Sequence, residues 1–178
     1  MLAVVFLGAA ALPAHADPAG RSEARARRGL AVGASVGAGM LSPDCDGCDA
    51  MGGPAADFHL GWMVTPRLSL QYDGSAVVHT GDGFGSEASL VMAAAGQYWA
   101  QPRLWIKPGI GIARLESRRG LFGQDEDSAV GFGALAAVGY EVYRAGRFTF
   151  DLHGRVTAGF YSDGRIINTA IQLGANWY

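Results

Sequence analysis

Apolar and polar residues alternate along most of this chain, and the ionised residues fall almost entirely on one of the two faces that the alternation defines. Between residues 148 and 161 the even positions are apolar or small, whereas the odd positions include Asp151, His153 and Arg155. A two-residue period is typical of a β-strand with two different faces. The apolar faces carry no ionised residue before Arg114, at a strand end. Because a charge at the centre of a bilayer costs about 2–4 kcal/mol, this pattern favours strands in contact with hydrocarbon.

The alternation recurs in eight segments, a number that closes a small barrel. The segments are residues 30–40, 56–64, 68–79, 90–98, 104–113, 130–142, 148–161 and 167–177. Pro108 lies inside the fifth segment, where its missing N–H favours a local bulge. After residue 16 no apolar run approaches the roughly 18–20 residues of a membrane-spanning helix. Only helices and closed barrels satisfy every backbone hydrogen bond in lipid. The sequence therefore predicts an all-β fold, an eight-stranded antiparallel up-and-down transmembrane β-barrel.

The connections between these segments differ at the two ends of the predicted barrel. Residues 65–67, 100–103 and 143–147 are short connections with a formal charge of +4, counting Asp, Glu and Arg. Residues 42–53, 79–87, 116–127 and 162–165 are mostly longer and carry −7 on the same count. Outer-membrane barrels have short periplasmic turns and longer external loops. Trp62, Trp99, Trp105 and Trp177 lie near the short connections or the C-terminus, so we expect one aromatic girdle at that interface.

The chain ends in Gln172-Leu173-Gly174-Ala175-Asn176-Trp177-Tyr178. With this aromatic ending and the hairpin pattern, the sequence resembles the small outer-membrane β-barrel proteins of Gram-negative bacteria, the outer membrane protein beta-barrel domain family. The resemblance implies a place in the cell outer membrane, contact with outer-membrane lipid, and delivery by the barrel assembly machinery. It also implies that Gly174, Trp177 and Tyr178 form the insertion signal, although here the two aromatic residues are adjacent.

The N-terminal residues divide into two segments that precede the barrel. An apolar run from Leu2 to Leu12 is followed by Ala14-His15-Ala16, which is the pattern of a signal peptide over residues 1–16. Residues 17–28 are charged and rich in small side chains, so we expect a flexible periplasmic tail. The transmembrane β-barrel domain would then comprise residues 29–178.

The inward face of the predicted strands carries polar and ionised side chains at similar distances from the short turns. They are Asp57, His59, Gln71, Asp73, Gln97, Lys107, Asp151, His153 and Arg155. Because eight strands enclose only enough space for side chains, we expect these residues to form one ion-pair layer that plugs the lumen. A narrow pore is the alternative if the layer can move aside.

Composition limits the other classes of function. Ionised residues make up 17% of the chain, Lys107 is the single lysine, and the net charge is −2, so no basic patch for nucleic acid is present. A secreted soluble barrel of the lipocalin kind, with an apolar ligand inside, would show the same alternation inverted. A soluble exterior built from glycine, alanine and serine would be unusual.

Catalysis is not expected, because the His-x-Ser pair of outer-membrane deacylases is absent from the sequence. Ser75, His79 and Glu87 are the remaining Ser/His/acid candidates, and loop and rim positions commonly carry such residues. His59 and His153 lack the spacing of metal ligands and are expected to belong to the polar network. The sequence therefore indicates a non-enzymatic protein without a cofactor, with a structural or surface-interaction role.

The first long loop contains the one local motif, Asp44-Cys45-Asp46-Gly47-Cys48-Asp49. In an oxidising exterior, Cys45 and Cys48 are expected to form a disulfide. Asp44, Asp46 and Asp49 are a weak calcium candidate, because the bidentate glutamate of calcium loops is missing. An extracellular partner, if the protein has one, would bind to such external loops.

Overall fold

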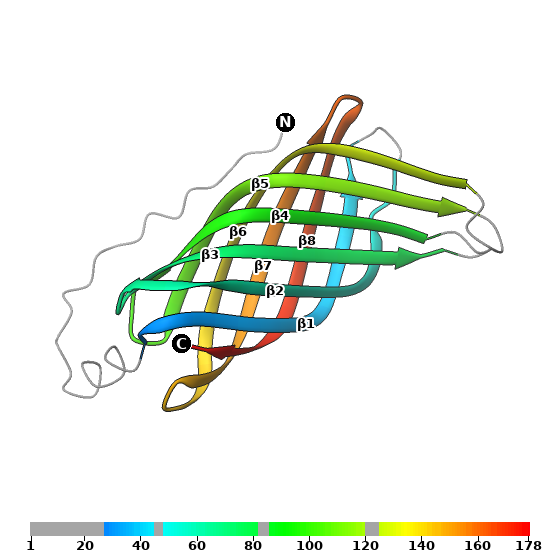
Figure 1. Cartoon of the computed structure of the whole chain (residues 1–178). Coiled ribbons are helices and arrows are strands. Elements are labelled where there is room, and N and C mark those ends of the chain that lie inside the picture. Colours follow the sequence, from blue (N-terminus) through cyan, green and yellow to red (C-terminus); the bar gives the residue numbers. More distant parts are fainter. Residues whose placement is uncertain (1–26, 45–47, 82–85, 120–124) are drawn as a thin grey trace.

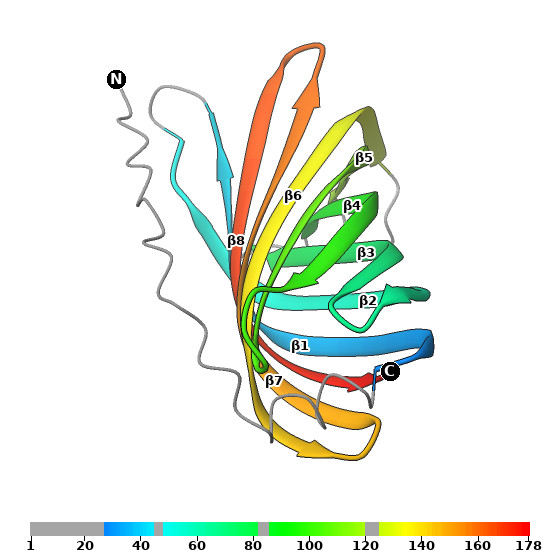
Figure 2. The same ribbon diagram turned by 90° about the vertical axis from the view of Figure 1, so that its left-hand side faces the viewer.

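The computed structural model describes residues 27–44, 48–81, 86–119 and 125–178, which form a closed barrel of eight antiparallel strands (Figure 1). The strands are β1 (Gly29–Pro43), β2 (Met51–Thr65), β3 (Leu68–Thr80), β4 (Ser86–Trp99), β5 (Leu104–Arg119), β6 (Asp125–Ala145), β7 (Phe148–Tyr161) and β8 (Gly164–Trp177). Each strand pairs with its neighbours in the sequence, and β8 closes the barrel against β1 from Val32–Trp177 upward (Figures 1 and 2). The predicted fold class is confirmed. Within the described residues no helix is long and apolar enough to span a membrane.

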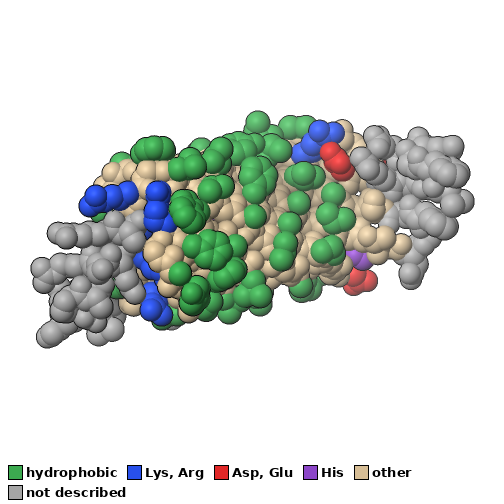
Figure 3. All heavy atoms as spheres, turned by 60° about the horizontal axis from the view of Figure 1, so that its bottom comes forward, with side chains coloured by type: hydrophobic (Ala, Val, Ile, Leu, Met, Phe, Trp, Pro, Cys, Tyr) green, Lys and Arg blue, Asp and Glu red, His purple; other side chains and the backbone are tan. Residues whose placement is uncertain are grey.

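The alternation places the apolar face outside and the charged face inside. Leu70, Ile106 and Phe150 are exposed on the exterior, whereas Asp73 and Arg155 are buried in the lumen. In Figure 3 apolar side chains form a band across the visible face, with arginine gathered toward one end and charges of both signs at the other. This arrangement does not fit the soluble alternative, which requires ionised residues on the outer surface at this level.

The two ends of the barrel differ in the length of their connections. The turn end carries the connections 66–67, 100–103 and 146–147, with Gly146 in the left-handed region at φ 61°. At the opposite loop end, β5 and β6 pair as far as Arg119–Asp125, beyond the predicted limits 113 and 130. Most residues in this outer part of the hairpin are polar. Apolar and polar positions therefore do not alternate there, and the sequence did not predict the longer strands.

Pro108 does not produce the expected bulge. The β4–β5 register is the same before and after it, running from Ala95–Gly109 to Tyr98–Ile106 with the two intervening pairs absent. Proline therefore interrupts the ladder without inserting a residue. Register shifts occur instead at Met63/Thr65 and Glu141/Tyr143, close to the turn end.

Candidate functional site: the closed lumen

The centre of the lumen is an ion-pair layer built around Asp73. The Oδ2 atom of this buried carboxylate accepts a bond of 3.0 Å from Lys107 Nζ, and its Oδ1 atom one of 2.5 Å from Arg155 Nη1. The three residues lie on β3, β5 and β7, so the contacts cross the interior. Arg155 Nη2 also lies 3.2 Å from Asp57 Oδ2 on β2. Four strands are therefore joined through one guanidinium, one ammonium group and two carboxylates.

His153 extends the layer from Asp57 to a third carboxylate, Asp151. Its Nε2 lies 3.2 Å from Asp57 Oδ2, and its Nδ1 lies 2.8 Å from Asp151 Oδ1. An imidazole that faces an acceptor at each nitrogen donates to both only in its charged form. Asp151 also accepts a bond of 2.8 Å from Asn176 Nδ2 on β8. With His153 charged, three cations balance three aspartates in this layer.

The other predicted members of the layer lie beside it or below it. His59 is buried against the ion pairs, in space that Gly33 leaves open, because a Cβ at Gly33 would overlap the imidazole ring. Gln71 Nε2 donates to Gln97 Oε1 over 3.1 Å. These two amides form a second level toward the turn end, whereas the hydrogen bonds of Asp73 run to Lys107 and Arg155.

The turn end of the lumen is closed by residues that the sequence analysis missed. Arg27, which precedes β1, is buried, and its Nη2 lies 3.0 and 3.1 Å from the two carboxylate oxygens of Glu141 on β6. The same guanidinium donates to Pro102 O at 2.5 Å and lies 4.4 Å from the Trp99 ring centroid. Trp99 Nε1 donates to Glu141 over 2.7 Å, and Arg144 also pairs with this carboxylate. Arg27 therefore reaches across the mouth from β1 to β4 and β6.

The predicted single girdle of four tryptophans is wrong. Trp99 and Trp105 are 1% and 2% exposed and point into the lumen, whereas Trp62 and Trp177 are 60% and 47% exposed on the outer wall. The two-residue period already indicates the inward direction of these two tryptophans, because Trp99 shares a face with Gln97 and Trp105 shares one with Lys107. No sequence pattern indicates the buried position of Arg27, because this residue belongs to the charged segment 17–28, for which we expect a flexible tail.

The last residues of the chain point in opposite directions. Trp177 faces outward, whereas Tyr178 is buried at the turn-end mouth, where its ring meets Trp99 edge-on at 5.0 Å. Burial raises the pKa of the Tyr178 phenol well above its usual value, so the group stays neutral and accepts a hydrogen bond from Gln97. Gly174 faces the lumen beside Asp151, and a Cβ there would lie 2.6 Å from Oδ1. The insertion signal itself remains a prediction.

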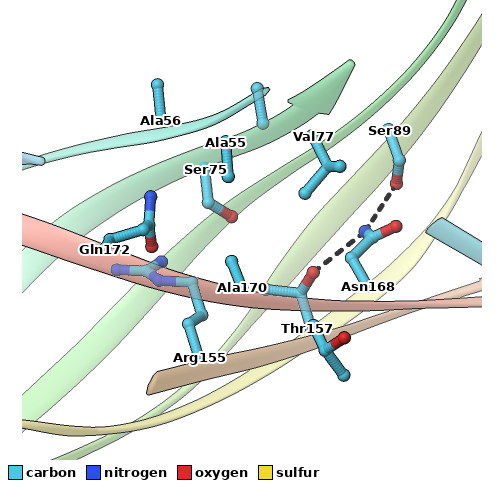
Figure 4. Close-up of a pocket in the computed structure, with 12 residues that line it drawn as sticks. Ala55, Ala56, Ser75, Val77, Ser89, Arg155, Thr157, Asn168, Ala170 and Gln172 are labelled. Carbon is cyan, nitrogen blue, oxygen red and sulfur yellow. Dashed lines mark hydrogen bonds between the residues drawn. The ribbon is translucent and has the colours of Figure 1, made fainter. Parts of the chain in front are cut away.

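Toward the loop end, and along β4–β6 at the level of the ion pairs, the lumen is mostly apolar. Two clusters fill it, one of Leu41, Ala55, Val77, Ile166 and Ala170, and one of Val91, Ala93, Ala95, Ala113 and Leu135. Between them Asn168 donates to Ser89 and Thr157 over 2.8 and 3.0 Å (Figure 4). The cavity beside Arg155 and Gln172 has a volume of about 10 Å³, which is room for about one water molecule.

The candidates near the loop end are not brought together as a site. Arg165 Nε lies 2.7 Å from Asp44 Oδ2, while Asp49 is exposed. Cys45 and Asp46 lie outside the described residues, so the disulfide with Cys48 and the calcium site stay predictions. Across the described ranges no group of three or more potential metal ligands occurs.

In the described part of the chain, the catalytic and metal-binding candidates also bond to groups other than one another. The side-chain hydrogen bonds of Ser75 and His79 run to the backbone oxygens of Val91 and Gly52 rather than to Glu87. Both nitrogens of His153 face carboxylates, so this histidine offers no lone pair to a metal shared with His59.

Comparison with known proteins identifies the fold. No protein-family model and no curated protein matches the sequence. The structure is similar to neisserial surface protein A, with a TM-score of 0.60 and 15% identity, covering 83% of this chain and 96% of that one. It is also similar to Ail, the attachment invasion locus protein of Yersinia pestis, with a TM-score of 0.60 and 12% identity, covering 85% and 99% of the two chains. At these identities the likeness shows the shared fold of small eight-stranded outer-membrane barrels.

Proposed function

We propose that this chain is an integral, non-enzymatic protein of the Gram-negative outer membrane with a closed lumen and a structural or surface-interaction role. One observation carries the proposal: the ionised residues of the central strands point inward and the large apolar residues point outward. Water-exposed apolar patches of a few hundred Å² already mark interaction sites or aggregation hazards. A wall of apolar side chains around a whole barrel fits hydrocarbon, and the two similar structures support the same location.

The closed lumen argues against a pore as the resting state. Lys107, Asp73, Arg155, Asp57 and His153 form a continuous chain of contacts between opposite walls. The Arg27–Glu141 pair closes the turn end independently. A molecule without a passage is more consistent with work done at its surfaces than with transport.

The longer connections at the loop end are the proposed contact surface for an extracellular partner. Ail has been crystallised with the heparin analogue sucrose octasulfate. The external connections of this chain carry a formal charge of −7, counting Asp, Glu and Arg. Repulsion between like charges disfavours a sulfated polysaccharide here, and we expect the partner surface to be neutral or cationic.

Membrane fractionation combined with heat-modifiability on gels tests the location. We expect the chain in the outer-membrane fraction, extracted only by detergent, with a folded form that migrates differently from the boiled form. Recovery of folded protein in the soluble fraction would contradict the proposal. Planar-bilayer recordings test the lumen: the wild-type barrel should show no steady current, and reproducible channels would favour the pore alternative.

A further inference from the structure

We propose that the turn end of the barrel carries a binding surface for the phosphate groups of anionic phospholipids. This surface, the arginine–tryptophan rim, consists of Arg28, Arg67, Arg147, Trp62 and Trp177. The proposal rests on the membrane insertion proposed above and adds a lipid class and a position to it.

The rim is continuous across neighbouring strands. Arg28 immediately precedes β1, whose first residue Gly29 pairs with Met63 of β2, and Arg67 lies in the turn that follows β2. On the other side of β1, β8 ends at Trp177, which pairs with Val32 and with Phe148 of β7. Arg147 lies in the turn that precedes β7. The three arginines and two tryptophans therefore occupy one side of the turn end.

Arg147 organises this surface. It donates from Nη2 to Arg28 O at 2.5 Å and from Nε to the oxygen of Tyr178, which ties the start of β1 to the last residue. Its guanidinium carbon lies 5.5 Å from the Trp177 ring centroid. Trp62 and Trp177 are exposed on either side of β1, at the level where amphipathic indoles meet the headgroup region.

Among the described residues, the side chains of Arg28 and Arg67 have no acidic partner. At the loop end the two arginines with described exposed side chains are both paired, Arg114 with Glu116 at 2.9 Å and Arg165 with Asp44 at 2.7 Å. At the turn end, no described carboxylate is exposed, because Glu141 is buried and bound by Arg27 and Arg144. Figure 3 shows the resulting cluster of cations beside the apolar band. The described part of the chain therefore supplies no counter-ion for these two side chains.

An anionic phospholipid supplies that counter-ion at the right depth. Its acyl chains would contact the apolar wall, and its phosphate would lie at the level of Trp62 and Trp177, within reach of Arg28 and Arg67. Guanidinium groups bind phosphate oxygens through paired, charge-assisted hydrogen bonds. Free phosphate offers the same oxygens but lacks the chains, so the two sources can be distinguished.

The tryptophans of the rim also report on its lipids. Trp99 and Trp105 are buried in the lumen, so quenching by lipids brominated near the headgroup comes from Trp62 and Trp177. The full chain is reconstituted into vesicles that contain phosphatidylglycerol and phosphatidylcholine, with one or the other brominated. We expect wild-type protein to prefer phosphatidylglycerol by about fivefold at low salt, and the double variant Arg28→Gln/Arg67→Gln to show no preference.

The matched control is Arg114→Gln/Arg165→Gln, which removes the same charge at the loop end and should keep the preference. Equal quenching of the wild type by both lipids, or equal loss of preference in both double variants, would contradict the proposed phospholipid site at the rim. Loss of the preference on adding millimolar inorganic phosphate at constant ionic strength would show that the rim binds anions in general rather than anionic phospholipids. Absence of quenching by any brominated lipid would instead contradict membrane insertion itself.

Discussion

A single buried carboxylate shows how the lumen is stabilised. Asp73 is 0% exposed and binds Lys107 and Arg155, which come from strands that are not its neighbours. Removing two ions from water is costly, so a buried pair stabilises little relative to apolar residues of the same volume. Removing one partner is a different matter, because the remaining charge keeps the desolvation penalty without its counter-ion. The layer therefore fixes which strands face each other across the lumen.

Asp73→Asn is expected to lower the free energy of unfolding by about 3–5 kcal/mol, because Lys107 and Arg155 then share a surplus of buried positive charge. Urea titration in bilayers, followed by the mobility shift of the folded form on gels, measures the loss. The control Asp73→Asn/Lys107→Met removes the surplus cation and should regain part of the stability. An Asp73→Asn protein as stable as the wild type would show that the layer is relaxed by water.

Arg27 and Arg28 offer a comparison between adjacent residues of the same type. Arg27 is 2% exposed and binds Glu141, Pro102 O and the Trp99 ring, whereas the side chain of Arg28 is exposed. Arg27→Ala is expected to lower the free energy of unfolding by about 1–3 kcal/mol, since Arg144 still pairs with Glu141. Arg28→Ala should change it by less than about 0.5 kcal/mol. Equal effects of the two substitutions in the same titration would contradict the buried contact.

At the scale of the strand, glycines let the small barrel curve tightly. An added Cβ at Gly111 on β5 would overlap the backbone oxygen of Met92 on β4, and one at Gly37 or Gly131 would likewise meet the backbone of an adjacent strand. Glycine at such positions permits the close approach of two backbones that a curved sheet requires. These glycines therefore mark positions where neighbouring strands approach most closely.

Gly111→Ala is expected to destabilise the barrel by about 1–3 kcal/mol, because the backbone of β4 must move to admit the methyl group. Gly154→Ala on β7 is the matched control, since nothing lies within 4 Å of the added Cβ. It should be neutral or slightly stabilising. Thermal midpoints of the heat-modifiability shift compare the two, and a larger loss for Gly154→Ala would refute this account of strand curvature.

The strands were predictable where one face meets the exterior and the other meets the polar lumen. Their limits were missed where the two faces have a similar composition. Parity placed Asp73, Lys107 and Arg155 inside, because lipid excludes ions from the opposite face. The outer part of the β5–β6 hairpin is mostly polar in sequence, and its alternation disappears. Trp99 and Trp105 were misplaced because a preference for membrane interfaces was applied against their parity. The contact of Arg27 with Glu141 is non-local, so neither propensity nor period could reveal it.

At the scale of the whole molecule, the lumen is closed by two polar layers in series and by the two apolar clusters. The middle layer contains Asp73, Lys107 and Arg155, and the turn-end layer contains Arg27, Trp99, Glu141 and Tyr178. Current through a pore requires every constriction along it to open at once. A substitution in one layer therefore leaves the other in place, which makes the closed state robust to single mutations.

This arrangement predicts a combined effect in planar bilayers. Asp73→Ala/Lys107→Ala/Arg155→Ala removes the middle layer and should remain without current, because Arg27 and Trp99 still fill the turn-end mouth. Adding Arg27→Ala and Trp99→Ala, together with Val77→Ala and Leu135→Ala in the two apolar clusters, should give resolved current steps, since water can then enter every filled level of the lumen. Heat-modifiability verifies that each variant is folded. Steady current from the middle-layer variant alone would mean that the turn-end layer does not seal the barrel, and the series arrangement would be wrong.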